Sequence, residues 1–148
     1  MDDARAASLR FVASQLVFVA ALVHLGLGAI EWARYASYGF LLPPDFRWPA
    51  FVFSGLAILG GLWLAHRAEN RRPYYLLGIL GMLTYVVGYF AWHLSGHRPR
   101  LVAGPSTHHH LTVGFVLEHY FAGLFETLSL TVELAAALLL AVLYVAER

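Results

Sequence analysis

The chain has 148 residues, of which 59% are hydrophobic and only 13% are charged, and its formal net charge is +1. Soluble domains are nearer half apolar and one quarter charged, so this composition excludes an ordinary soluble domain and indicates a membrane protein with about four spans. The absence of cysteine excludes disulfides, thiolate metal sites and cysteine nucleophiles, and the small net charge gives no nucleic-acid footprint.

The first expected span covers residues 11–32 and is too long for the apolar core of a signal peptide. Small and polar residues recur along it at steps of three and four, which places them on one helical face: Ser14, Val17, Ala21, His24, Gly28 and Glu31. Such a stripe is typical of a helix that packs against other helices in a bilayer, whereas the Leu, Val and Phe side chains elsewhere suit acyl chains.

Two further spans are expected at residues 49–65 and 74–94. Residues 33–48, before the second span, contain two prolines and several aromatic residues, which is typical of a loop at the membrane interface. The turn between the two spans, residues 66–73, carries three arginines and ends at Pro73, a residue favoured at the start of a helix.

A long histidine-rich loop, residues 95–112, precedes the fourth expected span at residues 122–144. The loop contains His108–His110, a tract that either binds metal or simply titrates in solvent. The apolar stretch 113–121 leaves two structures open, because it can extend the fourth span or form a short interfacial helix with a bend at Gly123.

Four spans with these connections predict an all-α integral membrane protein, an up-down four-helix transmembrane bundle formed by one domain, residues 1–148. The side of the membrane with the termini has six arginines: Arg5, Arg10, Arg67, Arg71, Arg72 and Arg148. The opposite side has four arginines: Arg34, Arg47, Arg98 and Arg100. This six-to-four bias favours a cell-membrane protein with both termini in the cytoplasm, because cytoplasmic loops carry an excess of positive charge. The long histidine-rich loop between the third and fourth spans then lies outside.

The fourth span is apolar enough to cross a bilayer, yet it carries Glu126 and Glu133. An ionised carboxylate near the middle of a bilayer is costly, so Glu133 is expected to face a partner, a cavity or a proton. His119, Glu126 and Glu133 follow one another at intervals of seven residues, close to two helical turns, so they lie on one face.

Counting residues from the span ends predicts two tiers of polar side chains in a compact bundle. The inner tier, near mid-bilayer, is His24 with Glu133. The outer tier consists of Glu31, His93, His97, His119 and Glu126. Tyr85 and Tyr89 lie on the helical line of His93 and are placed to donate hydrogen bonds to the inner tier.

Imidazole and carboxylate groups on facing helices are the ligands with which helical bundles bind Zn, Cu, Fe or Mn. We therefore expect a transition-metal site near the outer half of the bilayer, with the ligands His24, His93, His97, His119, Glu126 and Glu133. Glu31, Tyr85 and Tyr89 are expected to support these ligands. Haem with two histidine ligands is the weaker cofactor prediction, because His24 has no second histidine at its depth.

Two other functions stay open. The same residues can form hydrogen bonds between helices in an accessory or structural membrane subunit, at about 1–2 kcal/mol or less each. Alternatively, Glu133 can carry a proton or an ion, with Ser14 and Gln15 as the main polar residues for an inner path. Whether the protein is an enzyme is left open. The expected partners are the lipid bilayer and other membrane subunits or a second copy of the chain, and not nucleic acid.

Four stretches of the chain carry a resemblance to known sequences: AALVHLGLGAIEW, FVFSGLAILGGLWL, RRPYYLLGILGMLTYVVGY and TVELAAALLL. With His24, Glu133 and the RR-x-YYLLG turn, they resemble small four-span membrane proteins of unknown function that are common in haloarchaea. The resemblance implies the four-span architecture and brings no activity, cofactor or site residue with it.

Overall fold

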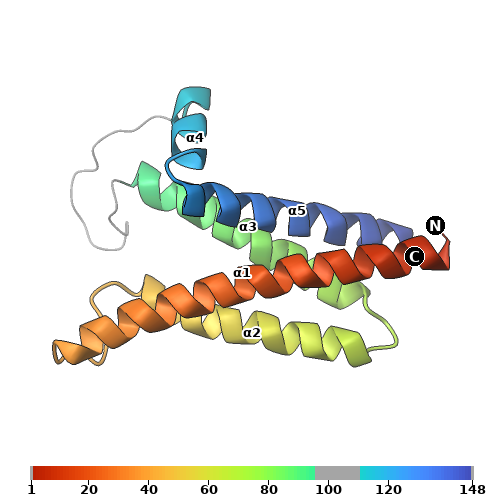
Figure 1. Cartoon of the computed structure of the whole chain (residues 1–148), viewed down its shortest axis with the longest axis horizontal. Coiled ribbons are helices and arrows are strands. Elements are labelled where there is room, and N and C mark those ends of the chain that lie inside the picture. The colour runs from red at the N-terminus through yellow and green to blue at the C-terminus, as the bar shows by residue number, and fades with distance from the viewer. Residues whose placement is uncertain (1, 96–110, 148) are drawn as a thin grey trace.

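The computed structural model describes residues 2–95 and 111–147, and within these ranges every regular element is an α-helix. In chain order the helices are α1 (Asp3–Ser37), α2 (Arg47–Arg67), α3 (Arg72–Leu94), α4 (Val113–Tyr120) and α5 (Leu124–Ala146) (Figure 1). Helices α1, α2, α3 and α5 are long and apolar enough to cross a membrane. The all-helical prediction is confirmed, and the four long helices fit a multi-pass membrane protein.

Helix α1 is longer than a bilayer requires. Its 35 residues extend about 50 Å at the usual helical rise, against about 30 Å for the hydrocarbon core. It therefore continues beyond the expected span, residues 11–32, at both ends. Asp2 caps its start by accepting a hydrogen bond of 2.8 Å from the backbone N–H of Arg5.

Helix α4 is a separate short helix that runs across the direction of α5 (Figure 1). The stretch 113–121 therefore forms an element of its own instead of extending the fourth span. The hydroxyl of Thr127, in the first turns of α5, shares its one hydrogen between the carbonyl oxygens of Tyr120 at 2.9 Å and Gly123 at 2.8 Å. These bonds fix the junction between the two helices.

The long helices pack side by side in the order α2, α1, α5, α3. Helix α1 packs along both α2 and α5, and α5 packs along α3, whereas α2 and α3 touch each other much less. The two ends of the chain lie together at one end of the bundle (Figure 1). There, Nη1 of Arg10 in α1 lies 3.0 Å from Oε1 of Glu147, the residue that follows α5.

Small residues form much of the contact between α1 and α5. Ala13 and Ala20 of α1 and Ala136 of α5 are at most 2% exposed, and they belong to one core cluster with Met82 of α3 and Leu143 of α5. Helices in a bilayer gain little from hydrophobic burial against one another, so their association depends on close packing and polar contacts. Alanine provides the close packing at this seam.

At the opposite end of the bundle, several side-chain contacts hold the start of α2 against the neighbouring segments. The indole N–H of Trp32 donates to the carbonyl oxygen of Leu41 at 2.8 Å, and Nη2 of Arg47 lies 2.6 Å from Oδ2 of Asp45. Burial by itself raises the pKa of Asp45, but the hydrogen bonds and charge of Arg47 outweigh it and hold this pKa below its ordinary value. The guanidinium of Arg47 also lies 3.6 Å over the ring of Trp92, which links α2 to the end of α3.

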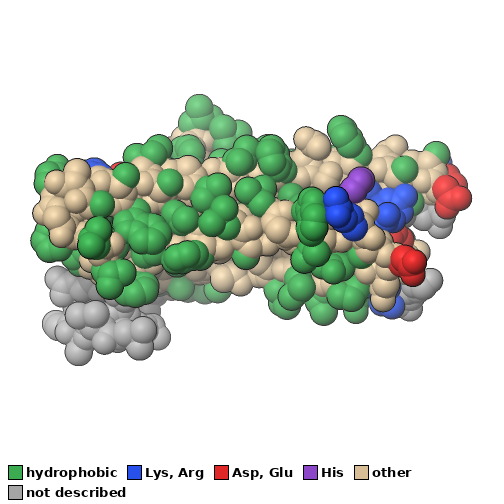
Figure 2. All heavy atoms as spheres, turned by 90° about the horizontal axis from the view of Figure 1, so that it is seen from below, with side chains coloured by type: hydrophobic (Ala, Val, Ile, Leu, Met, Phe, Trp, Pro, Cys, Tyr) green, Lys and Arg blue, Asp and Glu red, His purple; other side chains and the backbone are tan. Residues whose placement is uncertain are grey.

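Large apolar side chains cover the outside of the bundle. Phe11, Phe53, Trp63, Leu77 and Leu138 are each more than half exposed. Figure 2 shows hydrophobic side chains across the middle of one face and a group of charged side chains at the end that carries the termini. An apolar belt with a charged end suits surroundings of hydrocarbon and headgroups.

The approach of α1 to α2 requires glycine at position 28. A Cβ on Gly28 would lie 2.6 Å from the backbone oxygen of Trp48 and 2.9 Å from the backbone nitrogen of Val52. Because backbone atoms cannot move aside cheaply, Gly28→Ala should lower the free energy of unfolding by about 1–3 kcal/mol, measured by unfolding in detergent micelles. Gly26→Ala is the matched control, since a Cβ there meets nothing within 4 Å. Equal stability of the two variants would contradict the close α1–α2 contact.

Candidate functional site

Each long helix contributes a polar side chain to one level of the bundle. His24 comes from α1, Ser54 from α2, Tyr85 from α3 and Glu133 from α5. We refer to these four residues together with Ser129 of α5 as the polar layer. His24 and Glu133 are the most enclosed of them, with exposed fractions of 7% and 2%.

His24 and Glu133 form a buried pair between α1 and α5. Nε2 of His24 lies 3.5 Å from Oε1 of Glu133, an ion-pair distance that is long for a hydrogen bond. Nδ1 of His24 lies 2.9 Å from the carbonyl oxygen of Ala20, and since a carbonyl only accepts, Nδ1 must carry the proton that it donates. One further proton, on Nε2 or on the carboxyl, makes the pair neutral as a whole, which removes much of the cost of burying it.

One more contact supports Glu133 from its own helix, and two others extend the network from the pair to α3 and α2. The hydroxyl of Ser129 donates to Oε1 of Glu133 at 2.9 Å, from one turn earlier in α5. The ring of Tyr85 stacks on the imidazole of His24, with centroids 3.6 Å apart and planes inclined by 10°. The hydroxyl of Tyr85 donates to Oγ of Ser54 at 2.7 Å. The polar layer therefore connects α5, α1, α3 and α2 in succession.

A second group of rings lies where α3 meets α4. The centroids of His93 and His119 are 4.8 Å apart, and the hydroxyl of Tyr89 donates to the backbone oxygen of His119 at 2.9 Å. Nδ1 of His93 donates to the carbonyl of Tyr89, and Nδ1 of His119 to that of Phe115, each at 2.9 Å. We refer to His93 and His119 as the histidine pair. Because each Nδ1 carries the proton that it donates, Nε2 is the unprotonated nitrogen of each ring in the neutral form.

The remaining predicted ligands and supporting residues lie elsewhere or cannot be placed. The carboxylate of Glu126 folds back over Gly123 and fills the space where a Cβ of residue 123 would stand. Oε2 of Glu31 lies 3.3 Å from Nη1 of Arg34, one turn further along α1. His97, together with the triplet 108–110, lies outside the described residues.

The described parts of the chain bring the predicted metal ligands together only in pairs. Within residues 2–95 and 111–147, no three His, Asp or Glu side chains lie close enough to hold one metal ion. His24 is paired with Glu133, and His93 with His119. The transition-metal and haem cofactors therefore stay predictions.

One polar contact at the end of the bundle was not predicted. Glu147 accepts a hydrogen bond of 3.0 Å from Nη1 of Arg10 and another of 3.0 Å from the hydroxyl of Tyr75 in α3. We refer to these three residues as the end clamp. Arg10 and Glu147 are 137 residues apart in the chain, so no local pattern could reveal the contact. Ser129, by contrast, stands four residues before Glu133, and this helical spacing was a usable signal.

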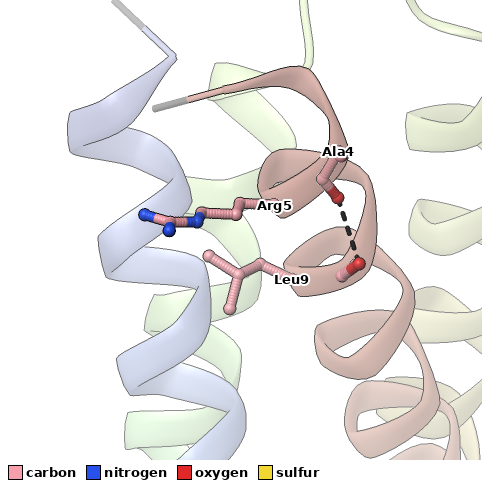
Figure 3. Close-up of a pocket in the computed structure, with 4 residues that line it drawn as sticks. Ala4, Arg5 and Leu9 are labelled. Atoms are coloured by element: carbon pink, nitrogen blue, oxygen red, sulfur yellow. Dashed lines mark hydrogen bonds between the residues drawn. The ribbon is translucent and has the colours of Figure 1, made fainter.

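A shallow hollow beside the first turns of α1 offers little chemistry (Figure 3). It is lined by Ala4, Arg5, Ser8 and Leu9. The hydroxyl of Ser8 donates to the carbonyl of Ala4 at 3.0 Å, and Nε of Arg5 lies 3.3 Å from a carboxylate oxygen of Asp2. These polar groups bond within their own helix end and do not converge on the hollow, so we assign it no role.

Comparison with known proteins gives no match: no protein-family model, curated protein or solved structure is significantly similar to this chain. The resemblance to four-span proteins of haloarchaea stays a prediction. The function is therefore inferred from the polar layer, the histidine pair and the surface of the bundle.

The pair of His24 and Glu133 should show energetic coupling. Glu133→Ala leaves a buried imidazole without its carboxyl partner, His24→Ala leaves a buried carboxyl without its imidazole, and the double variant leaves neither group. Unfolding in micelles of the parent, both single variants and the double variant should give a coupling energy of about 0.5–2 kcal/mol. Glu118→Ala combined with His24→Ala is the control, because Glu118 is exposed on α4. Strict additivity for His24 and Glu133 would show that they do not interact.

Proposed function

We propose that the chain is an accessory or structural membrane subunit in which the polar layer holds four spans together. The observation that supports this most strongly is the buried pair of His24 and Glu133, with 3.5 Å between Nε2 and Oε1. Separating α1 from α5 would leave both ionisable groups in hydrocarbon, where an unpaired charge is costly. The pair therefore works against separation of the central helices.

The residues of the polar layer make their side-chain contacts mainly with one another. Ser129, Tyr85 and Ser54 bond or stack with other members of the layer. The large cavity between α1, α2, α3 and α5 is lined by residues nearer the termini, and neither His24 nor Glu133 is among them. This arrangement supports a structural role for the pair better than a role in binding a substrate.

The proposed orientation places both termini in the cytoplasm. The two ends of the chain lie at the same end of the bundle, as four crossings require (Figure 1). The basic turn between α2 and α3 lies at that end as well, since the guanidinium of Arg72 stands 4.6 Å over the ring of Tyr144 near the end of α5. A cytoplasmic position agrees with the excess of arginine on this side. The histidine pair then lies toward the outer surface.

A subunit also needs a surface for its partner, and α3 offers one. A Cβ on Gly81 or Gly88 would meet nothing within 4 Å. Glycine on an open helix surface lets another membrane helix approach closely. We therefore propose that another membrane subunit, or a second copy of the chain, packs against this surface of α3.

Replacing Glu133 with glutamine distinguishes two roles for this residue, a structural contact between helices and the transport of protons. The amide of Glu133→Gln has the same shape and can donate to Nε2 of His24, so the free energy of unfolding should stay within about 1 kcal/mol of the parent. Proteoliposomes with a pH-sensitive dye should show no proton flux that depends on Glu133. A flux in the parent that is lost in Glu133→Gln would instead assign Glu133 as a carrier of protons.

A metal bound by the histidine pair is the second candidate function. The two rings stand 4.8 Å apart on different helices, and each Nδ1 donates to a backbone carbonyl. This bond is common in histidines that bind metal through Nε2, because it fixes the orientation and tautomer of the ring. Zinc sites in proteins have three or four protein ligands, and His97 is the predicted third ligand.

Elemental analysis of tag-free protein tests this candidate. Near-stoichiometric Zn, Cu, Fe or Mn is expected in the parent and a strong loss in His119→Ala, because the ring of His119 would supply one ligand. His66→Ala is the control, since His66 lies in the last helical turn of α2, at the other end of the bundle. Metal-free parent protein, or metal retained fully in His119→Ala, would exclude the histidine pair as a metal site.

A further inference from the structure

A cavity of about 590 Å³ lies between α1, α2, α3 and α5 on the side of the bundle that carries the termini. Helices α2 and α3 are joined nearer the other end, where Tyr85 bonds Ser54 and Arg47 covers Trp92. Between the polar layer and the turn after α2, side chains of both helices line the cavity. Gly61 lines the cavity, and a Cβ there would meet nothing within 4 Å, so the missing side chain enlarges the space. Gly78 also lines the cavity, but the side chain of Leu140 fills the place of its Cβ.

The lining changes in character along the helices. Its inner part, toward the polar layer, consists of apolar side chains that include Val17, Ile58 and Leu140. Its outer part, toward the turn between α2 and α3, includes His66 and Arg71. The cavity is therefore apolar in depth and basic at its mouth, which is the profile of a site for an amphiphile with an acidic head.

Arg71 provides the charge that this head would meet. Its Nε donates to the carbonyl of Ala65 at 3.3 Å, and among the described residues no carboxylate lies at ion-pair distance from it. Arg10 also lines the cavity, but its charge is already balanced by Glu147 in the end clamp. Arg71 is thus the guanidinium at the mouth that has no acidic partner in this part of the protein.

We propose that this cavity binds one anionic phospholipid of the surrounding bilayer. Its phosphate would contact Arg71, and one acyl chain would lie between α2 and α3 against the inner lining. The volume falls in the range of about 300–1,000 Å³ that is usual for small-molecule sites. The opening at a basic turn beside two membrane helices favours a lipid over a water-soluble anion, because headgroups stand at this depth. This lipid site is independent of the proposed structural role of the polar layer, which requires no bound lipid.

Native mass spectrometry of the detergent-purified full chain tests the proposal with two probes, phosphatidylglycerol and phosphatidylcholine with identical acyl chains. The parent should retain one phosphatidylglycerol per chain, about fivefold more readily than phosphatidylcholine, since one arginine near the membrane surface contributes about this factor toward an acidic lipid. Arg71→Gln should lower phosphatidylglycerol to the level of phosphatidylcholine. Gly61→Leu, which puts a side chain into the cavity, should lower the retention of both lipids.

Two matched variants control for general effects. Gly60→Leu adds the same side chain on α2, and a Cβ at either glycine meets nothing within 4 Å, but Gly60 does not line the cavity. Arg67→Gln removes a neighbouring charge whose guanidinium lies 4.2 Å over Trp63 and not on the cavity. Equal retention of both lipids by the parent would overturn the proposal. Equal losses of lipid retention in Gly61→Leu and Gly60→Leu would also overturn the proposal. Equal losses of phosphatidylglycerol in Arg71→Gln and Arg67→Gln would overturn it as well. The arginine variants, which change side chains near the surface, keep the test decisive if Gly61→Leu fails to fold.

Discussion

The buried contact between His24 and Glu133 is the constraint on which the arrangement of the four long helices depends. A carboxyl and an imidazole that are 2% and 7% exposed require polar partners in an apolar setting, and the two groups lie at ion-pair distance from each other. The contact can form only if α1 and α5 lie against each other in one register. Alanines along this seam allow the approach, and Ser129 and Tyr85 support the two groups from either side.

The polar layer also divides the bundle into two unlike halves. Within the layer, α2 and α3 are joined by the bond from Tyr85 to Ser54, and on the side away from the termini they are joined by the stacking of Arg47 on Trp92. On the side of the termini, the end clamp holds α1 to α5 and α3, and the cavity lies beside it. The seam between α1 and α5 is therefore joined by polar contacts at two levels, and the cavity lies at only one end of the bundle.

Much of this arrangement followed from the sequence because the cost of a charge in hydrocarbon is a strong constraint. The position of Glu133 within an apolar span required a partner, and counting depth from the span ends selected His24. Depth does not give the direction in which a side chain points around its helix. Glu31 was therefore expected in the outer tier with Glu126 and His119, but it pairs with Arg34 on its own helix.

Other features could not be predicted from the sequence. Each span has apolar residues on all of its faces, so the sequence does not show which face of a helix packs against which neighbouring helix. The order of the helices, the bond from Tyr85 to Ser54 and the end clamp all depend on such facing. For residues 113–121 the sequence leaves two structures open, a continuous helix or a short helix with a bend at Gly123, and the structure has the second, with the hydroxyl of Thr127 bonded at the junction.

A distance measurement in lipid bilayers tests the central contact most directly. Solid-state NMR on protein with ¹⁵N-labelled histidine and ¹³C-labelled glutamate carboxyl groups reports dipolar coupling between the two. The contact of 3.5 Å between Nε2 of His24 and Oε1 of Glu133 predicts a coupling in the parent that is absent from His24→Asn. The absence of this coupling in the folded parent would contradict the pairing of α1 with α5 through these residues, and with it the proposed role of the polar layer.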